Sequence, residues 1–174
     1  ILLTFGNLPV SQHHDVFERE ALSRFERSPE QIEVVPETPF DSPKRAHHHY
    51  AIEDADTHNK THLIMGWKLG ESADLDAMLE AQLLSSVLME NSASPPMQWL
   101  ETNDLGSAPS PLCGLEDSMR EMVLCCGIEG SNEHDVYAFE ASVIEVINRT
   151  EEEGVPTARL DAILHQIELH QRGV

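Results

Sequence analysis

Aromatic residues, basic residues and cysteines are all scarce in this chain of 174 residues. Aromatic side chains make up 5% of the sequence against 40% for all hydrophobic types, which predicts an aliphatic core. No run approaches the roughly 20 apolar residues that a membrane-spanning helix needs, so we expect no membrane partner. The sequence starts at Ile1, inside the apolar run ILLTF, without a methionine or a signal-peptide pattern. That start indicates a piece of a longer protein, and targeting signals could lie outside it.

The shortage of basic residues limits the kinds of partner. Lysine and arginine number 11 against 31 aspartates and glutamates, which gives a formal net charge of −20. Binding a phosphate backbone needs clustered Lys and Arg, so the composition argues against a nucleic-acid partner. Two interpretations of the negative charge stay open: it attracts basic peptides, or it only keeps the surface soluble.

The three cysteines are Cys113, Cys125 and Cys126. Their odd number argues against a disulfide framework. Adjacent residues on a strand point to opposite faces, which argues against a cysteine-based zinc site at Cys125 and Cys126. We therefore expect thiols that fill the core of a protein kept in a reducing, cytosol-like compartment.

The most regular stretch of the sequence is residues 61–100. Residues 61–69 are apolar at nearly every step, which predicts a strand covered on both faces and ended by Gly70. Ser72 is predicted to cap the helix that follows, and Pro95 and Pro96 stop that helix and open another. The buried stripe of the long helix is predicted from apolar residues spaced three and four apart: Leu75, Met78, Leu79, Leu83, Val87 and Leu88.

The rest of the chain completes the predicted fold. We expect a strand over residues 1–5, a helix from residue 11 or 12 to about 27, and a short strand over 50–53. Residues 107–114 contain prolines, so a strand there is an edge strand, whereas 119–128 is predicted to be a central strand. Two helices follow, one over about 131–153 and one that begins at Pro156. The apolar stripe of the first is Val136, Phe139, Val143, Val146 and Ile147. The apolar stripe of the second is Leu160, Ile163, Leu164 and Ile167. This order predicts an α+β fold, an antiparallel or mixed sheet with helices packed on one face.

Four segments, taken in order, resemble a known family. They read TFGNLP, ALSRFER, LLSSVLMENSASPPMQWLE followed by LG, and LDAILHQIELHQR. Together they are similar to the presequence-protease branch of the insulinase (pitrilysin) zinc metallopeptidases, and the similarity runs through essentially the whole chain. Residues 83–100 are the most specific part. Gly173 departs from the acidic residue that the family pattern has after Arg172.

The resemblance implies a domain organisation. Family members are about a thousand residues long and consist of four related α+β domains, in two halves that enclose a peptide. Residues 1–27 would be the end of the first, catalytic domain, 28–49 a proline-rich linker, and 50–174 most of a second, non-catalytic domain. The segment would form part of the substrate-chamber wall. Its partners would be the remaining domains and unstructured peptides, with basic peptides as a candidate class, in the cytoplasm of a bacterium or an organelle matrix of a eukaryote.

The resemblance also implies that zinc is bound elsewhere in the parent protein. The family motif is H-x-x-E-H, with two histidines on one helix face and a glutamate that activates the metal-bound water. The closest match here runs from His165 to His170 and is one residue too long. Five residues turn a helix by about 500°, so the two rings diverge by about 140°. We therefore expect no catalytic residue and no metal ligand in this segment.

A peptide-binding exosite is the remaining function that the resemblance implies. In relatives, an edge strand of the second domain and the loop before it hold the distal end of the substrate by β-augmentation. The matching stretches are 91–96 and 107–114, although these are equally read as a helix–helix turn and a proline-protected edge. The candidate exosite residues are Asn91, Ser92, Ser94, Ser107, Ser110 and Leu112.

Two alternative functions stay open. The segment could belong to a catalytically inactive structural homologue, which only upstream sequence separates from an active peptidase. It could also be a stand-alone peptide-binding module, which predicts peptide binding by this chain alone.

Overall fold

The computed structural model describes residues 2–30, 32–53 and 56–173. The chain divides into two compact units, Ile1–Val35 and Pro36–Val174. The division falls inside the predicted linker, while the assignment of residues 1–27 and 50–174 to two domains of a parent stays a prediction. No helix in the described part of the chain is long and apolar enough to cross a membrane.

The first unit contains α1 (Val10–Glu20) and the short 3-10 helix η1 (Leu22–Arg24). The helix predicted to reach residue 27 ends early because Ala21 leaves the helical conformation, with φ −134° and ψ −61°. Residue 1 of the predicted first strand lies outside the described residues. Residues 2–5 form no strand, because no other strand of this unit offers them a hydrogen-bonding partner. The apolar residues Val16, Leu22 and Phe25 of this unit are exposed, and Phe17 is half-buried.

The second unit is built on an antiparallel sheet. Its strands are β1 (Thr61–Glu71), β2 (Ala108–Pro109), β3 (Gly114–Glu116) and β4 (Glu121–Ser131). β4 pairs with β1 on one side and with β2 and β3 on the other, which confirms the predicted central strand and the proline-containing edge. The strand predicted over residues 50–53 is wrong, since these residues are irregular.

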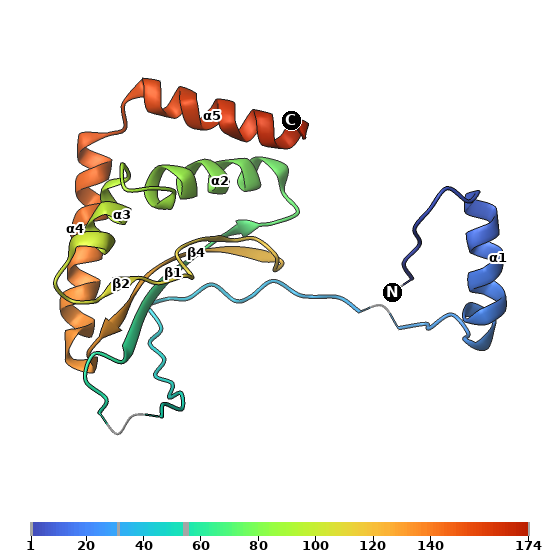
Figure 1. Cartoon of the computed structure of the whole chain (residues 1–174), viewed down its shortest axis with the longest axis horizontal. Helices are drawn as coiled ribbons and strands as arrows, with labels where there is room; N and C mark the ends of the chain where they lie inside the picture. The colour runs from blue at the N-terminus through green and yellow to red at the C-terminus, as the bar shows by residue number, and fades with distance from the viewer. Residues whose placement is uncertain (1, 31, 54–55, 174) are drawn as a thin grey trace. The chain divides into compact units, whose positions relative to one another are not determined.

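Helices cover one face of this sheet, so the predicted fold class is confirmed. They are α2 (Leu75–Met89), α3 (Pro95–Thr102), α4 (Val136–Glu153), preceded by the 3-10 helix η2 (Glu133–Asp135), and α5 (Thr157–Arg172). α2 packs on β1, β3 and β4, and α5 packs on α2 from outside (Figure 1). Gly154 ends α4 with a positive φ of 71°, which glycine adopts readily.

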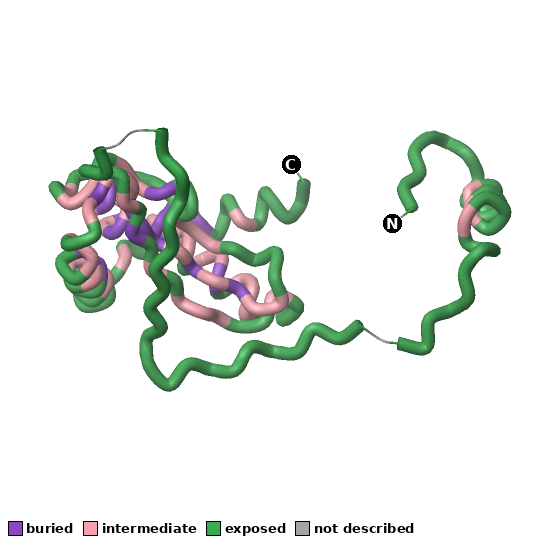
Figure 2. Tube along the Cα trace, turned by 90° about the horizontal axis from the view of Figure 1, so that it is seen from below, coloured by how far each residue is buried: buried purple, intermediate pink, exposed green. Residues whose placement is uncertain are grey.

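The core lies between the helices and the sheet, where the buried residues gather in Figure 2. Phe139 and Leu100, from α4 and α3, are each 1% exposed, and Met122 and Ile128 of β4 are fully buried. The predicted stripe of α4 is confirmed. Phe139, Val143 and Val146 are buried, and Val136 and Ile147 are half-buried.

The predicted stripes of α2 and α5 are correct only in part. Val87 and Leu88 of α2 are buried, but Leu79 and Leu83 are half-buried and Leu75 is 69% exposed. α5 packs mainly against α2; it buries Ile163 and leaves Leu164 50% exposed.

The predicted cap of α2 is also corrected. Asp74 is the N-cap residue, and its carboxylate accepts hydrogen bonds from the backbone N–H groups of Asp76 and Ala77 at 3.0 and 3.2 Å. The Ser72 hydroxyl instead donates to the Met119 carbonyl at 2.6 Å, which joins the end of β1 to the turn before β4.

Candidate functional site

The loop between α2 and α3 holds three of the predicted exosite residues. Asn91 orders the loop, since its side-chain oxygen accepts from the Ala93 N–H at 3.0 Å and its carbonyl accepts from the Ser94 N–H at 2.8 Å. Ser92 is exposed and donates to Glu101 of α3 at 3.0 Å. Ser94 is fully buried. The part of the loop open to a ligand is therefore residues 91–93.

Arg159, at the start of α5, fixes this loop. Its guanidinium donates to the Ala93 carbonyl at 2.8 Å, to the Val87 carbonyl at 3.0 Å, and to the Ser94 hydroxyl. These charge-assisted bonds satisfy the Val87 carbonyl, which the end of α2 leaves unpaired, and the Ala93 carbonyl of the loop. Arg159 therefore fixes the conformation of the loop, and the buried Ser94 hydroxyl is one of the groups through which it does so.

The other three predicted exosite residues lie along β2 and the turn into β3. The N–H and hydroxyl of Ser107 both donate to the Glu129 carbonyl, at 2.8 and 3.1 Å. Ser110 is buried; its N–H donates to the Gly127 carbonyl at 2.9 Å, and its hydroxyl accepts from the Leu112 N–H at 3.2 Å. Leu112 is 61% exposed and presents an apolar side chain.

The structure therefore divides the six candidates by accessibility. Asn91, Ser92, Ser107 and Leu112 are exposed, whereas Ser94 and Ser110 are buried supports. No hydrogen bond between described residues joins the 91–96 loop to the 107–114 stretch. The exosite assignment stays a prediction.

A feature that the sequence prediction missed is the uncovered face of the sheet. In β1, Leu63, Met65 and Trp67 pair with Ile128, Cys126 and Leu124 of β4, and these residues face the helices. The intervening residues point the other way, where no described helix of the second unit packs. We call this surface the open face; its residues are His62, Ile64, Gly66 and Lys68 of β1, Glu116 of β3, and Glu121, Val123, Cys125, Gly127 and Glu129 of β4.

The open face has an apolar, small-residue centre and a charged rim. Ile64 is 45% exposed, and Gly66 lies opposite Cys125 in the register. At one end His62 Nδ1 is 3.9 Å from a Glu129 oxygen. At the other end Lys68 Nζ is 2.9 Å from a Glu121 oxygen. A surface with small side chains at its centre and polar side chains at its ends suits an extended polypeptide better than a compact ligand.

Among the rim residues, Glu121 has a carboxyl whose pKa is lowered by the hydrogen bonds that it accepts. The hydrogen bond from Lys68, followed by one from the Glu37 N–H, holds the pKa of the Glu121 carboxyl below its ordinary value of 4.5. A carboxyl whose pKa is lowered by folding stabilises the fold above its unfolded-state pKa. That contribution is lost as the pH falls through the folded-state pKa.

This predicts that Glu121→Gln lowers the free energy of unfolding at pH 7 and that its difference from wild type shrinks as the pH drops below 4.5. Urea unfolding at a series of pH values measures it. Glu80→Gln, on the exposed side of α2, is the control and should stay within about 0.5 kcal/mol of wild type. If the loss of unfolding free energy in Glu121→Gln stayed the same at every pH tested, the negative charge of the Glu121 carboxylate would not be what stabilises the fold.

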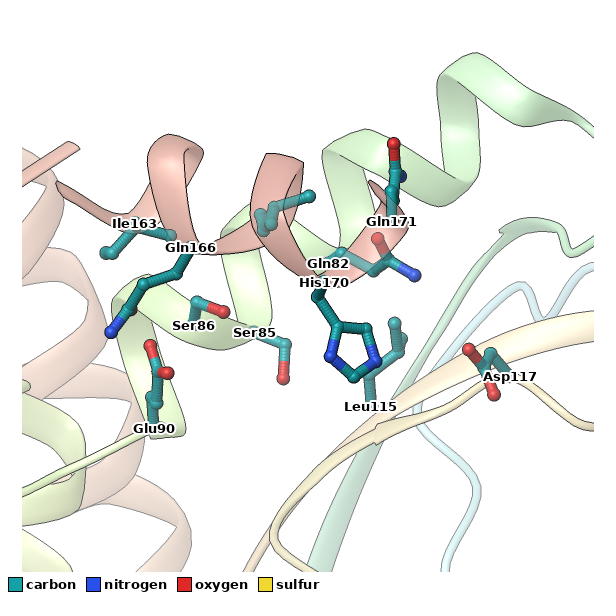
Figure 3. Close-up of a pocket in the computed structure, with 11 residues that line it drawn as sticks. Gln82, Ser85, Ser86, Glu90, Leu115, Asp117, Ile163, Gln166, His170 and Gln171 are labelled. Carbon is teal, nitrogen blue, oxygen red and sulfur yellow. The ribbon is translucent and has the colours of Figure 1, made fainter. Parts of the chain in front are cut away.

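A second concave feature lies on the helix side. A cavity of about 450 Å³ opens between α2, α5 and the β3 turn, and Figure 3 shows His170 pointing into it beside Ser85 and Leu115. Its lining residues carry mostly amides, hydroxyls and carboxylates, and its apolar members are Leu115, Ile163 and Ile167. The cavity is thus a groove between two helices, lined mainly by polar residues.

The residues present do not fit a zinc site. Within residues 2–30, 32–53 and 56–173, no three His, Cys, Asp or Glu side chains are grouped to hold a metal ion. His165 and His170 are both exposed on α5, and His165 faces Glu168 of the same helix at 4.0 Å. We therefore assign no metal chemistry to this chain's own residues.

Cys126 is a core residue, Cys113 packs against the core, and Cys125 is half-buried on the open face. Burial raises the pKa of the Cys126 thiol to about 12 and also raises the pKa of Cys113 and Cys125. The Cys113 thiol lies 3.3 Å from the Gly127 N–H, which donates to it. Thiols with raised pKa values stay protonated at neutral pH, which makes them poor nucleophiles.

Comparison with known proteins agrees with the fold. A sequence profile described as the Peptidase M16 inactive domain matches residues 1–167. The protein named "Presequence protease, mitochondrial" from Danio rerio is 32% identical over 172 residues, which is 97% of this chain and 17% of that protein. Proteins of the same name from Xenopus tropicalis and Mus musculus are 29% and 30% identical, again over 97% of this chain and 17% and 16% of their own lengths.

The chain thus spans about one sixth of the length of the curated relatives it matches. The profile covers nearly all of it, and the resemblance seen in the sequence is confirmed. The chain belongs to the family of Peptidase M16 inactive domains.

Proposed function

We propose that this chain is a non-catalytic part of a zinc metallopeptidase that degrades unstructured peptides, and that it forms part of the wall of the substrate chamber. The observation that carries the proposal is the match to the inactive-domain profile over residues 1–167. The 32% identity with a presequence protease supports it. The zinc ligands would then lie in other parts of the parent protein.

The open face is the surface that supports a role in the wall. A sheet with helices on one face normally buries that face and leaves the other to water or to a partner. Here the free face has Ile64 and glycine at its centre, a contact between His62 and Glu129 at one end of β1, and the Lys68–Glu121 ion pair at the other. In the proposed chamber this face contacts the peptide, while α5 faces away.

The first unit favours a larger assembly over the stand-alone peptide-binding module. Leu3, Phe5, Phe25 and Ile32 are 86%, 95%, 76% and 97% exposed. Large apolar side chains gathered in a short segment mark a surface that another part of a protein covers. The remaining domains of the parent chain are the partner we propose.

The charge and the relatives suggest the peptide class and the compartment. A net charge of −20 favours basic peptides by electrostatic attraction, if the acidic side chains line the chamber. The relatives carry the word mitochondrial in their names, and the three free cysteines fit a reducing compartment. We place the protein in an organelle matrix.

Photo-crosslinking tests the proposed peptide contact. Benzoylphenylalanine replaces Ile64 on the open face or Leu164 on α5; the native side chains are 45% and 50% exposed, so the two probes are matched. A fluorescein-labelled, unstructured basic peptide is added to the protein that carries this domain, and to the chain alone. We expect crosslinks from position 64 and none from position 164.

Four other outcomes are informative. Crosslinking from position 164 alone, or from neither position, would reject the open face as the peptide-contacting wall. Equal crosslinking from both would indicate non-specific adsorption and reject it equally. Strong saturable binding by the chain alone would favour the stand-alone module.

A further inference from the structure

One segment of the chain lies at the rim of the open face and is held there by its backbone. Residues 36–50, which we call the strap, contact the sheet first at Glu37. The Glu37 N–H donates to a Glu121 oxygen at 2.7 Å, and its carbonyl accepts from Lys68 Nζ at 2.8 Å. Lys68 and Glu121 also bond to each other at 2.9 Å. The ion pair therefore binds both main-chain groups of a single residue.

This contact has the features of a backbone-binding site. A neighbouring strand would offer the same pair of groups, one N–H and one C=O, whatever its side chains. Here a carboxylate and an ammonium take the place of that strand, which makes both bonds charge-assisted. The Lys68 and Glu121 side chains are 24% and 17% exposed, so their neighbours hold them in position.

The strap cannot extend this contact into a strand. Pro36 and Pro39 have no N–H, which leaves only Glu37 and Thr38 as backbone donors across that stretch. No hydrogen bond joins the described residues 38–44 to the sheet. The strap is thus attached at this end through one residue.

A separate anchor holds the far part of the strap. Arg45 donates to both carboxylate oxygens of Glu140 on α4, the first at 2.7 Å, and lies 5.9 Å from the centre of the Tyr137 ring. Tyr50 donates to the Lys60 carbonyl and packs edge-on against His62. Release of Glu37 would leave these contacts in place, so the near end can lift without unfolding the unit.

We propose that Lys68 and Glu121 form a binding site for the main chain of an extended peptide, filled by Glu37 when no peptide is bound. An unstructured peptide on the open face would displace Glu37 and offer its own N–H to Glu121 and its own C=O to Lys68. The site would recognise backbone and not sequence. This inference rests on the proposed function, because the peptide lies on the same open face.

The test separates the backbone of Glu37 from its side chain. Glu37→Pro removes the N–H that Glu121 accepts, whereas Glu37→Ala keeps it and removes only the carboxylate. The probe is a fluorescein-labelled peptide of Gly, Ala and Ser, followed by anisotropy with the whole chain. Because the strap competes for the site, we expect Glu37→Pro to tighten binding by about threefold or more and Glu37→Ala to match wild type.

One further measurement completes the design. The double variant Lys68→Met with Glu121→Gln should bind the probe more weakly than wild type.

The proposal is overturned if Glu37→Pro and Glu37→Ala bind alike, or if the double variant binds as wild type does. Failure of these tests with crosslinking from position 64 intact would reject the backbone site alone. If position 64 gave no crosslink even without a substitution at Glu37, Lys68 or Glu121, the proposed function itself would be rejected.

Discussion

Replacing Phe139 by alanine should lower the free energy of unfolding by about 3–5 kcal/mol. Phe139 is 1% exposed, belongs to the core cluster, and packs against Trp99 of α3 with ring centres 6.0 Å apart. Truncation would remove its buried surface and leave a cavity between α4, α3 and the sheet, which cannot fully collapse. Urea unfolding followed by circular dichroism measures the loss.

Tyr137 provides the control on the same helix. It is 70% exposed and contacts the Arg45 guanidinium at its ring. Tyr137→Ala should cost less than about 1 kcal/mol, since it removes an exposed cation–π contact and little buried area. Similar losses for the two variants would mean that α4 does not present its Phe139 side to the sheet.

Gly127→Ala should destabilise the unit by about 1–3 kcal/mol, although it adds only one methyl group. A Cβ atom at this position would lie 2.6 Å from the Leu63 carbonyl oxygen, 3.0 Å from Ile64 Cγ1 and 3.2 Å from Ser110 Cβ. The closest of these atoms is backbone, so β1 and β4 must move apart to relieve the contact. Thermal unfolding at fixed pH reports the effect.

Gly66 is the matched control for Gly127, from the neighbouring strand and the same open face. Its nearest atom would be Val123 Cγ1 at 3.3 Å, a side-chain methyl that can shift slightly. Gly66→Ala should change the unfolding free energy by less than about 1 kcal/mol. If the two variants lost equal stability, the close approach of the strands at Gly127 would not be the cause.

The sequence predicted the order of the central strand, the edge and the helices, but it gave the wrong environment for β1. Ile64 and Gly66 read as members of an apolar run, so the run looked like a strand buried on both faces. Only His62 and Lys68 signal the alternation that the structure shows. A one-sided strand with isoleucine and glycine on its free side is hard to tell from a buried one by periodicity.

The candidate site was predictable to a similar extent. The prolines at 95 and 96 located the loop between α2 and α3, as the structure confirms. The burial of Ser94 depends on Arg159, which lies 65 residues away in the sequence. The contact of Glu37 with Lys68 and Glu121 likewise joins residues 31 and 84 positions apart. Local patterns carry no information on such long-range partners.

The most direct test of the non-catalytic assignment is turnover by this chain alone. The purified chain is stripped with a chelator, dialysed, and assayed with an unstructured fluorogenic peptide before and after zinc is restored. Because no described residues are placed to grip a metal, we expect zinc well below one equivalent per chain and no hydrolysis in either state. Peptide hydrolysis by the clean chain, abolished by the chelator and restored by zinc, would contradict the assignment.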